Sequence, residues 1–122
     1  MKILLVDDDE AILLWVRRHL EARQYEVEDA FSGEQGLREY LRQGPRTWDF
    51  VLSDYCFIPS ERVKDGLQLV SEIQAVNPQQ RMAIHTGEKN LRAPVPVLHK
   101  PYPIGQLLRI LREPVRSLAS SV

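Results

Sequence analysis

Short apolar runs alternate along the chain with longer segments whose apolar residues recur at helical spacing. Three of the runs are almost unbroken: residues 3–6, 50–52 and 82–84. Such runs are typical of central parallel strands, because helices cover both faces of the sheet. Two weaker runs predict edge strands: acidic residues flank Val27, and Pro96, which cannot donate to a strand ladder, interrupts residues 95–98. The alternation indicates an α/β domain.

Four further segments carry an apolar face with helical period. They contain Ile12, Val16 and Leu20; Leu37, Tyr40 and Leu41; Leu67, Val70 and Ile73; and Ile104, Leu107, Leu108, Leu111, Val115 and Leu118. Pro114 should end or kink the last helix. Strong inner strands with weak second and fifth strands predict a flavodoxin-like three-layer sandwich, whose five-stranded parallel sheet has the order 2-1-3-4-5. Right-handed crossovers then place every strand's carboxyl end at one edge of the sheet, where ligands bind.

Composition narrows the class of protein. With 122 residues, of which 43% are hydrophobic and 27% charged, we expect one domain, residues 1–122, with a core of its own. Neither an apolar run long enough for a membrane span nor an export signal is present, and the single cysteine, Cys56, agrees with a reducing compartment. We therefore expect a cytoplasmic protein without membrane contact. The net charge of -1 argues against direct nucleic-acid binding.

Polar residues gather where the inner strands and the last strand end. They are Asp7, Asp8 and Asp9, then Ser53 and Asp54, then Thr86, and finally Lys100. Three or more neighbouring carboxylates repel one another, so the site must keep a proton or recruit a cation. Carboxylate oxygens without a histidine or cysteine cluster favour Mg²⁺ over zinc. A carboxylate nucleophile attacking phosphorus needs alignment and charge neutralisation, and Lys100, Thr86 and the metal could supply both.

Four motifs follow the predicted strands in a fixed order. They are Ile3-Leu4-Leu5-Val6-Asp7-Asp8-Asp9, Val51-Leu52-Ser53-Asp54, Ile84-His85-Thr86-Gly87 and His99-Lys100-Pro101. Together they resemble the CheY-like receiver domain of bacterial response regulators, from Met1 to about Leu118. The resemblance implies that Asp54 accepts a phosphoryl group from a sensor histidine kinase or phosphotransfer protein, which switches the binding of a downstream protein. It implies a phosphoacceptor rather than a turnover enzyme.

The resemblance also assigns roles to the site residues. Mg²⁺ would be held by Asp7, Asp8, Asp54 and the backbone carbonyl of Cys56, with Asp8 preferred over Asp7 as the direct ligand. The hydroxyl of Thr86 would contact the phosphoryl group. Lys100 would pair with the phosphoryl oxygens, and the peptide bond that follows this lysine is usually cis in the family.

The chain departs from the family pattern in two places. The segment 55–64, between Asp54 and the Asp65-Gly66 pair, is several residues longer than is typical of receivers. Only 13 residues, 87–99, separate Thr86 from Lys100, too few for a fourth helix and a fifth strand of normal length. Together with two prolines, this spacing predicts a fourth helix that is reduced or lost. Val97 also stands where many receivers have the aromatic residue that rotates on phosphorylation.

Two other functions fit parts of the sequence. The run that ends in Asp7 and Asp9 also matches the strand-Asp-x-Asp motif of haloacid-dehalogenase-like phosphatases, although the chain has no room for a cap domain. A degenerate receiver that binds partners without phosphorylation is the other alternative.

Several residues also have plainer interpretations. Asp9 and Glu10 could simply begin a helix. We interpret His85 and His99 as structural or exposed residues, and Trp15 and Trp48 as packing residues. Acidic neighbours should raise the pKa of the Cys56 thiol.

Overall fold

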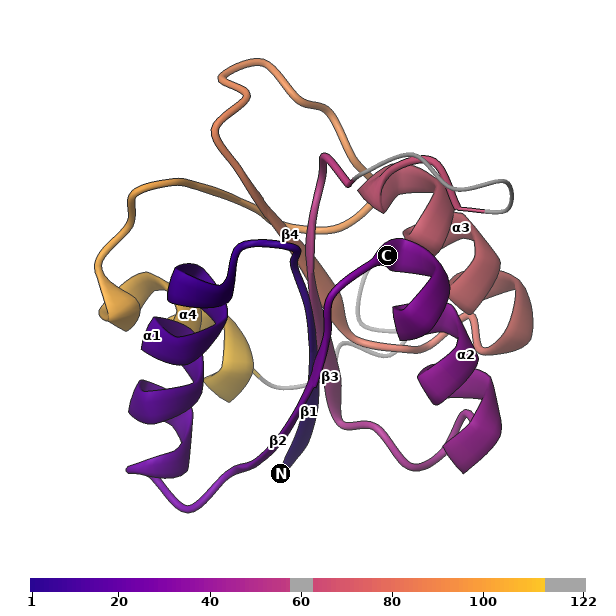
Figure 1. The fold of residues 1–122 in the computed structure, drawn as a ribbon, viewed down its shortest axis with the longest axis horizontal. Helices are drawn as coiled ribbons and strands as arrows, with labels where there is room; N and C mark the ends of the chain where they lie inside the picture. Colours follow the sequence, from indigo (N-terminus) through magenta and orange to yellow (C-terminus); the bar gives the residue numbers. More distant parts are fainter. Residues whose placement is uncertain (58–62, 114–122) are drawn as a thin grey trace.

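A computed structural model describes residues 1–57 and 63–113 (Figure 1). Its centre is a sheet of five parallel strands in the order β2-β1-β3-β4-β5. The strands are β1 (Lys2–Val6), β2 (Glu26–Ala30), β3 (Phe50–Asp54), β4 (Met82–Thr86) and β5 (Val97–His99). The order predicted from apolar strength is therefore confirmed, with the two weakest strands at the edges.

In the described part of the chain, two helices pack on each face of the sheet, which gives three layers (Figure 1). The helices α1 (Glu10–Glu21) and α4 (Ile104–Arg112) share one apolar core with Ile3 and Leu5. The helices α2 (Gly33–Gln43) and α3 (Gly66–Val76) share the other core with Leu4 and Val6. Successive residues of a strand point to opposite faces, so a strand covered on both sides must be apolar at every position.

Polar side chains begin three of the helices. Asp9, Ser32 and Asp65 each accept a hydrogen bond from a backbone N–H of the first turn, at α1, α2 and α3 respectively. These bonds satisfy donors that a helix start leaves without partners. Asp9 is thus a helix cap, as the plainer interpretation of the acidic run suggested.

The segment between β4 and β5 contains no helix, and all of its residues, 87–96, lie within the described part of the chain. The predicted loss of the fourth helix is confirmed. Leu91, Ala93 and Val95 instead pack against the core beside α3. The expected fifth strand at residues 95–98 begins only at Val97, because Pro96 has no N–H and contributes just a carbonyl, which accepts from the N–H of Ile84.

One detail of the predicted helices needs correction. Leu41, which was grouped with the core face of its helix, is exposed, because it follows the buried Tyr40 by one position and so points about 100° away. The last helix ends at Arg112, before Pro114, in agreement with the predicted effect of this proline. Val115 and Leu118, which were grouped with this helix, lie outside the described residues. Within the described ranges, no helix is both long and apolar enough to cross a bilayer.

Candidate functional site

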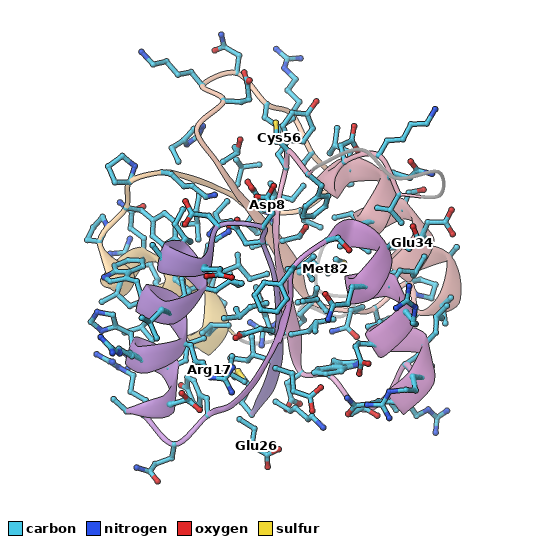
Figure 2. All side chains as sticks on the ribbon, in the orientation of Figure 1. Asp8, Arg17, Glu26, Glu34, Cys56 and Met82 are labelled. Carbon is cyan, nitrogen blue, oxygen red and sulfur yellow. The ribbon has the colours of Figure 1, made fainter. Side chains whose placement is uncertain are left out.

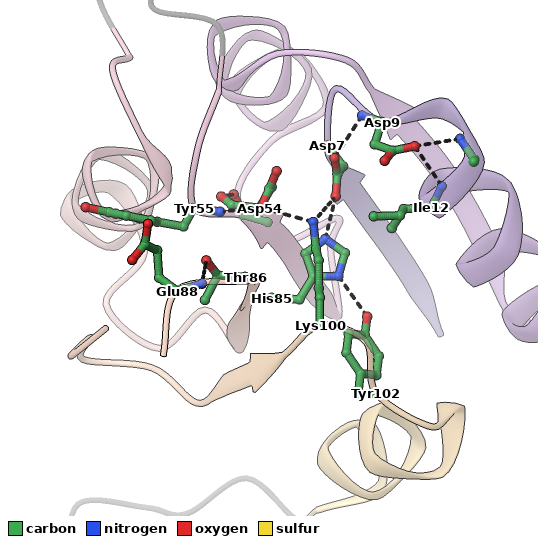
Figure 3. Close-up of polar contacts among 12 residues, drawn as sticks. Asp7, Asp9, Ile12, Asp54, Tyr55, His85, Thr86, Glu88, Lys100 and Tyr102 are labelled. Atoms are coloured by element: carbon green, nitrogen blue, oxygen red, sulfur yellow. Dashed lines mark hydrogen bonds and ion pairs between the residues drawn. The ribbon is translucent and has the colours of Figure 1, made fainter. Parts of the chain in front are cut away.

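The polar residues predicted at the strand ends lie together at one edge of the sheet (Figure 3). Asp7 directly follows β1, Asp54 ends β3 and Thr86 ends β4. Lys100 follows β5, and its backbone N–H donates to the carbonyl of Thr86 at 2.8 Å. Parallel strands with short connections at this edge thus bring residues up to 93 positions apart into contact.

Asp7 is the most enclosed carboxylate of the site, with none of its surface exposed. Its Oδ1 accepts from the N–H of Asp9 at 2.9 Å. Its Oδ2 is shared by His85 Nε2 at 2.7 Å and Lys100 Nζ at 3.0 Å. Burial disfavours the ionised form, but these hydrogen bonds and the charges of His85 and Lys100 outweigh it and hold the pKa of Asp7 below its ordinary value. Asp7 is therefore a buried, permanently ionised carboxylate at neutral pH.

Asp54 is a buried carboxylate with fewer partners. Its Oδ1 accepts from the N–H of Tyr55 at 2.8 Å and from Lys100 Nζ at 3.2 Å, and no described residue donates to its Oδ2. Burial and then the negative charge of Asp7 raise the pKa of Asp54, and the charge of Lys100 offsets only part of this. For Lys100 itself, the charges of Asp7 and Asp54 outweigh burial and raise the pKa of the ammonium. One lysine thus bridges two carboxylates whose combined charge exceeds its own.

Asp8 and Cys56 lie at the same edge of the sheet (Figure 2). The side chain of Asp8 is exposed, so it faces solvent beside the buried pair. Cys56 is also exposed, and burial of part of the side chain, followed by the charge of Asp54, raises the pKa of its thiol. The direction of this shift is the one expected from the sequence.

Thr86 is buried, and its hydroxyl accepts from the N–H of Glu88 at 3.0 Å. This hydrogen bond orients the hydroxyl within the turn that leaves β4. It also ties the side chain to the start of the segment that replaces a helix. A group that engaged Thr86 would therefore act on that segment directly.

Part of the enlarged segment after β3 packs down onto the core. Phe57 and Val63 are both buried against the core beside α2 and α3. Cys56, which precedes Phe57, and Asp65, which follows Val63 by two positions, form an isolated antiparallel β-bridge. The N–H of Gly66 donates to the carbonyl of Tyr55 at 2.6 Å, so the start of α3 is fixed against the end of β3.

Sequence reasoning placed His85 outside the site, but the structure places it at the centre. The ring is buried, with Nε2 on Asp7 and Nδ1 at 2.8 Å from the hydroxyl of Tyr102. Tyr102 is also buried, and its ring has an edge contact with Trp15, which is partly exposed. The only signal in the sequence was a polar residue at the end of an apolar strand, next to Thr86.

The donor set suits a hard cation. Ligand atoms of Asp7, Asp54 and His85 all lie within 4.8 Å of one another. Because an ionised carboxylate can only accept, the Nε2 of His85 must carry the proton of its hydrogen bond to Asp7, and a protonated nitrogen cannot bind a metal. The carboxylates remain as ligands. Burial and then the charge of Asp7 raise the pKa of Asp54, and a divalent cation would neutralise the excess negative charge of the pair.

Comparison with known proteins agrees with this geometry. A family model of the response regulator receiver domain matches residues 3–111. The chain belongs to this family. It is a receiver domain of the kind found in two-component response regulators, and the solved receiver structures bear out the CheY-like fold.

Individual relatives show how far the similarity extends. The transcriptional regulatory protein GlrR of Escherichia coli (strain K12) is 36% identical over 89 residues, which are 73% of this receiver and 18% of GlrR. The receiver therefore spans less than a fifth of that relative. A receiver domain from Clostridium thermocellum has a TM-score of 0.78 at 27% identity, with 90% of each chain covered. The fold also matches TrrA from Thermotoga maritima in complex with Mg²⁺ and a beryllofluoride, with a TM-score of 0.76 at 23% identity over 88% of this chain and 93% of TrrA.

Proposed function

We propose that this receiver accepts a phosphoryl group on Asp54 from a sensor histidine kinase or a phosphotransfer protein, and that phosphorylation switches the binding of a downstream protein. The observation that carries the proposal is the position of Lys100, whose Nζ lies 3.2 Å from Oδ1 of Asp54 and 3.0 Å from Oδ2 of Asp7. A cation held between a nucleophile and a second carboxylate suits the negative charge of an incoming phosphoryl group.

The proposed reaction is an in-line displacement at phosphorus. An oxygen of Asp54 forms a bond to phosphorus while the bond from phosphorus to the donor's imidazole nitrogen breaks, and its electron pair stays on that nitrogen. Oδ2 of Asp54 is the oxygen without a described donor, and Lys100 can turn from the carboxylates to the phosphoryl oxygens. The hydroxyl of Thr86 lies at the end of the neighbouring strand, within the same cluster of strand ends.

Asp7, Asp8, Asp54 and the carbonyl of Cys56 would hold Mg²⁺, which supplies charge neutralisation and a fixed position for the phosphoryl oxygens when it is bound. Asp7 already has three donors on its two oxygens. The exposed Asp8 has more freedom to bind a cation directly, which supports its assignment as the preferred ligand.

The phosphatase alternative is not favoured. Its two motif carboxylates are both engaged elsewhere, since Asp7 is buried under three donors and Asp9 caps α1. We propose a cytoplasmic phosphoacceptor that is not a turnover enzyme, with protein partners and without direct contact to nucleic acid or membrane.

Intact-mass analysis after incubation with acetyl phosphate and Mg²⁺ tests the proposal. One added phosphoryl group is expected on the wild-type chain and none on Asp54→Asn. Asp49→Asn is the matched control, because Asp49 is exposed and directly precedes β3, at the end of the strand opposite to Asp54. Persistence of the label in Asp54→Asn would place the acceptor elsewhere, and multiple turnover of a phosphomonoester would favour the phosphatase.

A further inference from the structure

A buried chain of hydrogen bonds leads from the site into the core on the α1 side of the sheet. It runs from Oδ2 of Asp7 to Nε2 of His85 at 2.7 Å, and from Nδ1 of His85 to the hydroxyl of Tyr102 at 2.8 Å (Figure 3). The exposed fractions are 0% for Asp7, 2% for His85 and 7% for Tyr102. The roles assigned to the site residues so far do not use either ring.

The direction of these bonds follows from the chemistry of the groups. An ionised carboxylate has no proton to give, so Nε2 of His85 donates to Asp7. The other ring nitrogen, Nδ1, lies 2.8 Å from the hydroxyl of Tyr102, so both nitrogens of the ring are hydrogen-bonded. Burial, followed by the charges of Asp7 and Asp54, raises the pKa of Tyr102 well above its ordinary value, so the hydroxyl keeps its proton. Tyr102 thus fixes the orientation of the ring that directs Nε2 toward Asp7.

We infer that His85, oriented by Tyr102, is a positioning residue that holds Asp7 in place when Lys100 turns from Asp7 toward the phosphoryl group. The inference rests on the proposed phosphorylation of Asp54. His85 and Lys100 share one oxygen of Asp7, so the departure of Lys100 leaves His85 as the only described side chain donating to that oxygen.

Burial makes this second donor important. A buried carboxylate that loses its partners must stay in place as an uncompensated charge, rotate or take up a proton, and each of these costs free energy. Without the N–H of His85, the attraction between Asp7 and Lys100 would hold the ammonium back from the phosphoryl oxygens. With it, Lys100 can move while Asp7 remains ionised and aligned.

Two amide substitutions separate this role from packing. The side-chain amide of Gln reaches about as far as Nε2 of histidine, so His85→Gln keeps a donor to Asp7. The amide of Asn ends near the position of Nδ1, so His85→Asn keeps a partner for Tyr102 but has none for Asp7. Tyr102→Phe removes only the hydroxyl and keeps the ring that contacts Trp15.

The experiment measures the rate of acetyl phosphate labelling of Asp54 in wild type and the three variants, after thermal melts show comparable stability. Loss of a hydrogen bond to a buried charge predicts labelling about tenfold slower in His85→Asn. His85→Gln should stay within about threefold of wild type, and Tyr102→Phe should fall between the two amide variants.

A measurement on the metal-free protein provides an independent readout. The proton on Nε2 of His85 should be visible by ¹⁵N-edited NMR because it is buried and hydrogen-bonded, and its exchange with water should accelerate in Tyr102→Phe.

The outcomes are distinguishable. No label on wild-type Asp54 would overturn the proposed function and this inference together. Normal labelling with equal rates in the Asn and Gln variants, or an exchange rate unchanged by Tyr102→Phe, would overturn the positioning role alone.

Discussion

Gly66→Ala should displace the end of β3, the strand that ends in Asp54, although Gly66 itself lies in α3. Gly66 is the first residue of α3, and a Cβ at this position would lie 2.2 Å from the carbonyl oxygen of Asp54 and 2.9 Å from Cα of Tyr55. Non-bonded heavy atoms prefer separations of roughly 3.5 Å, so the end of β3 or the start of α3 must shift by about 1 Å. Both neighbours are backbone atoms, so no side chain can rotate away.

Two effects of opposite sign set the magnitude. Alanine is intrinsically better than glycine in a helix by up to about 1 kcal/mol. Overpacking that forces backbone shifts costs about 1–3 kcal/mol, and a contact as short as 2.2 Å belongs at the upper end. We therefore expect the free energy of unfolding to fall by about 2 kcal/mol. The displaced carboxyl of Asp54 should also be labelled at least about tenfold more slowly, since misalignment of about 1 Å is costly in a reaction that depends on geometry.

Gly105→Ala provides the control, because a Cβ there meets no atom within 4 Å. Gly105 lies in the first turn of α4, and its substitution should stabilise the fold by up to about 1 kcal/mol without changing the labelling rate. Urea unfolding measures both free energies, and intact-mass kinetics with acetyl phosphate measures both rates. If Gly66→Ala were as stable as wild type and labelled at the same rate, the contact between α3 and β3 would not constrain the acceptor as the structure indicates.

Three further predictions concern the same edge of the sheet. Asp8→Ala should weaken Mg²⁺ binding, measured by calorimetry, whereas Lys100→Ala should chiefly slow the labelling of Asp54 by acetyl phosphate. Equal Mg²⁺ affinity in wild type and Asp8→Ala would contradict the metal assignment. Without metal, Asp54→Asn should raise the melting temperature at pH 7, because the raised pKa of Asp54 means that its ionised form destabilises the fold. That gain should vanish as the pH falls below the ordinary carboxyl pKa of 3.8, where the wild-type residue is protonated in both states, and a gain independent of pH would refute the reasoning. A beryllofluoride phosphoryl mimic should change hydrogen exchange in residues 55–64 and 86–90, because Thr86 is hydrogen-bonded to Glu88 and no helix lies between β4 and β5. Changes confined to residues 95–111 would refute this prediction.

The sequence by itself determined the layers, the strand order and the positions of the acidic and basic residues at the strand ends. Local patterns suffice for these features, because a strand covered on both faces must be apolar throughout and parallel strands must end at one edge. The spacing of 13 residues between Thr86 and Lys100 similarly predicted the missing helix, since chain length limits what a segment can form.

Only the tertiary structure decided which partners each polar group has. No local pattern distinguishes the buried Asp7 from the exposed Asp8, because their environments depend on the turn that leaves the strand. The hydrogen bond from His85 to Asp7 joins residues 78 positions apart. It exists because β1 and β4 are the two neighbours of β3 in the sheet. Both side chains are buried, so each can form hydrogen bonds only with the groups that the fold places beside it.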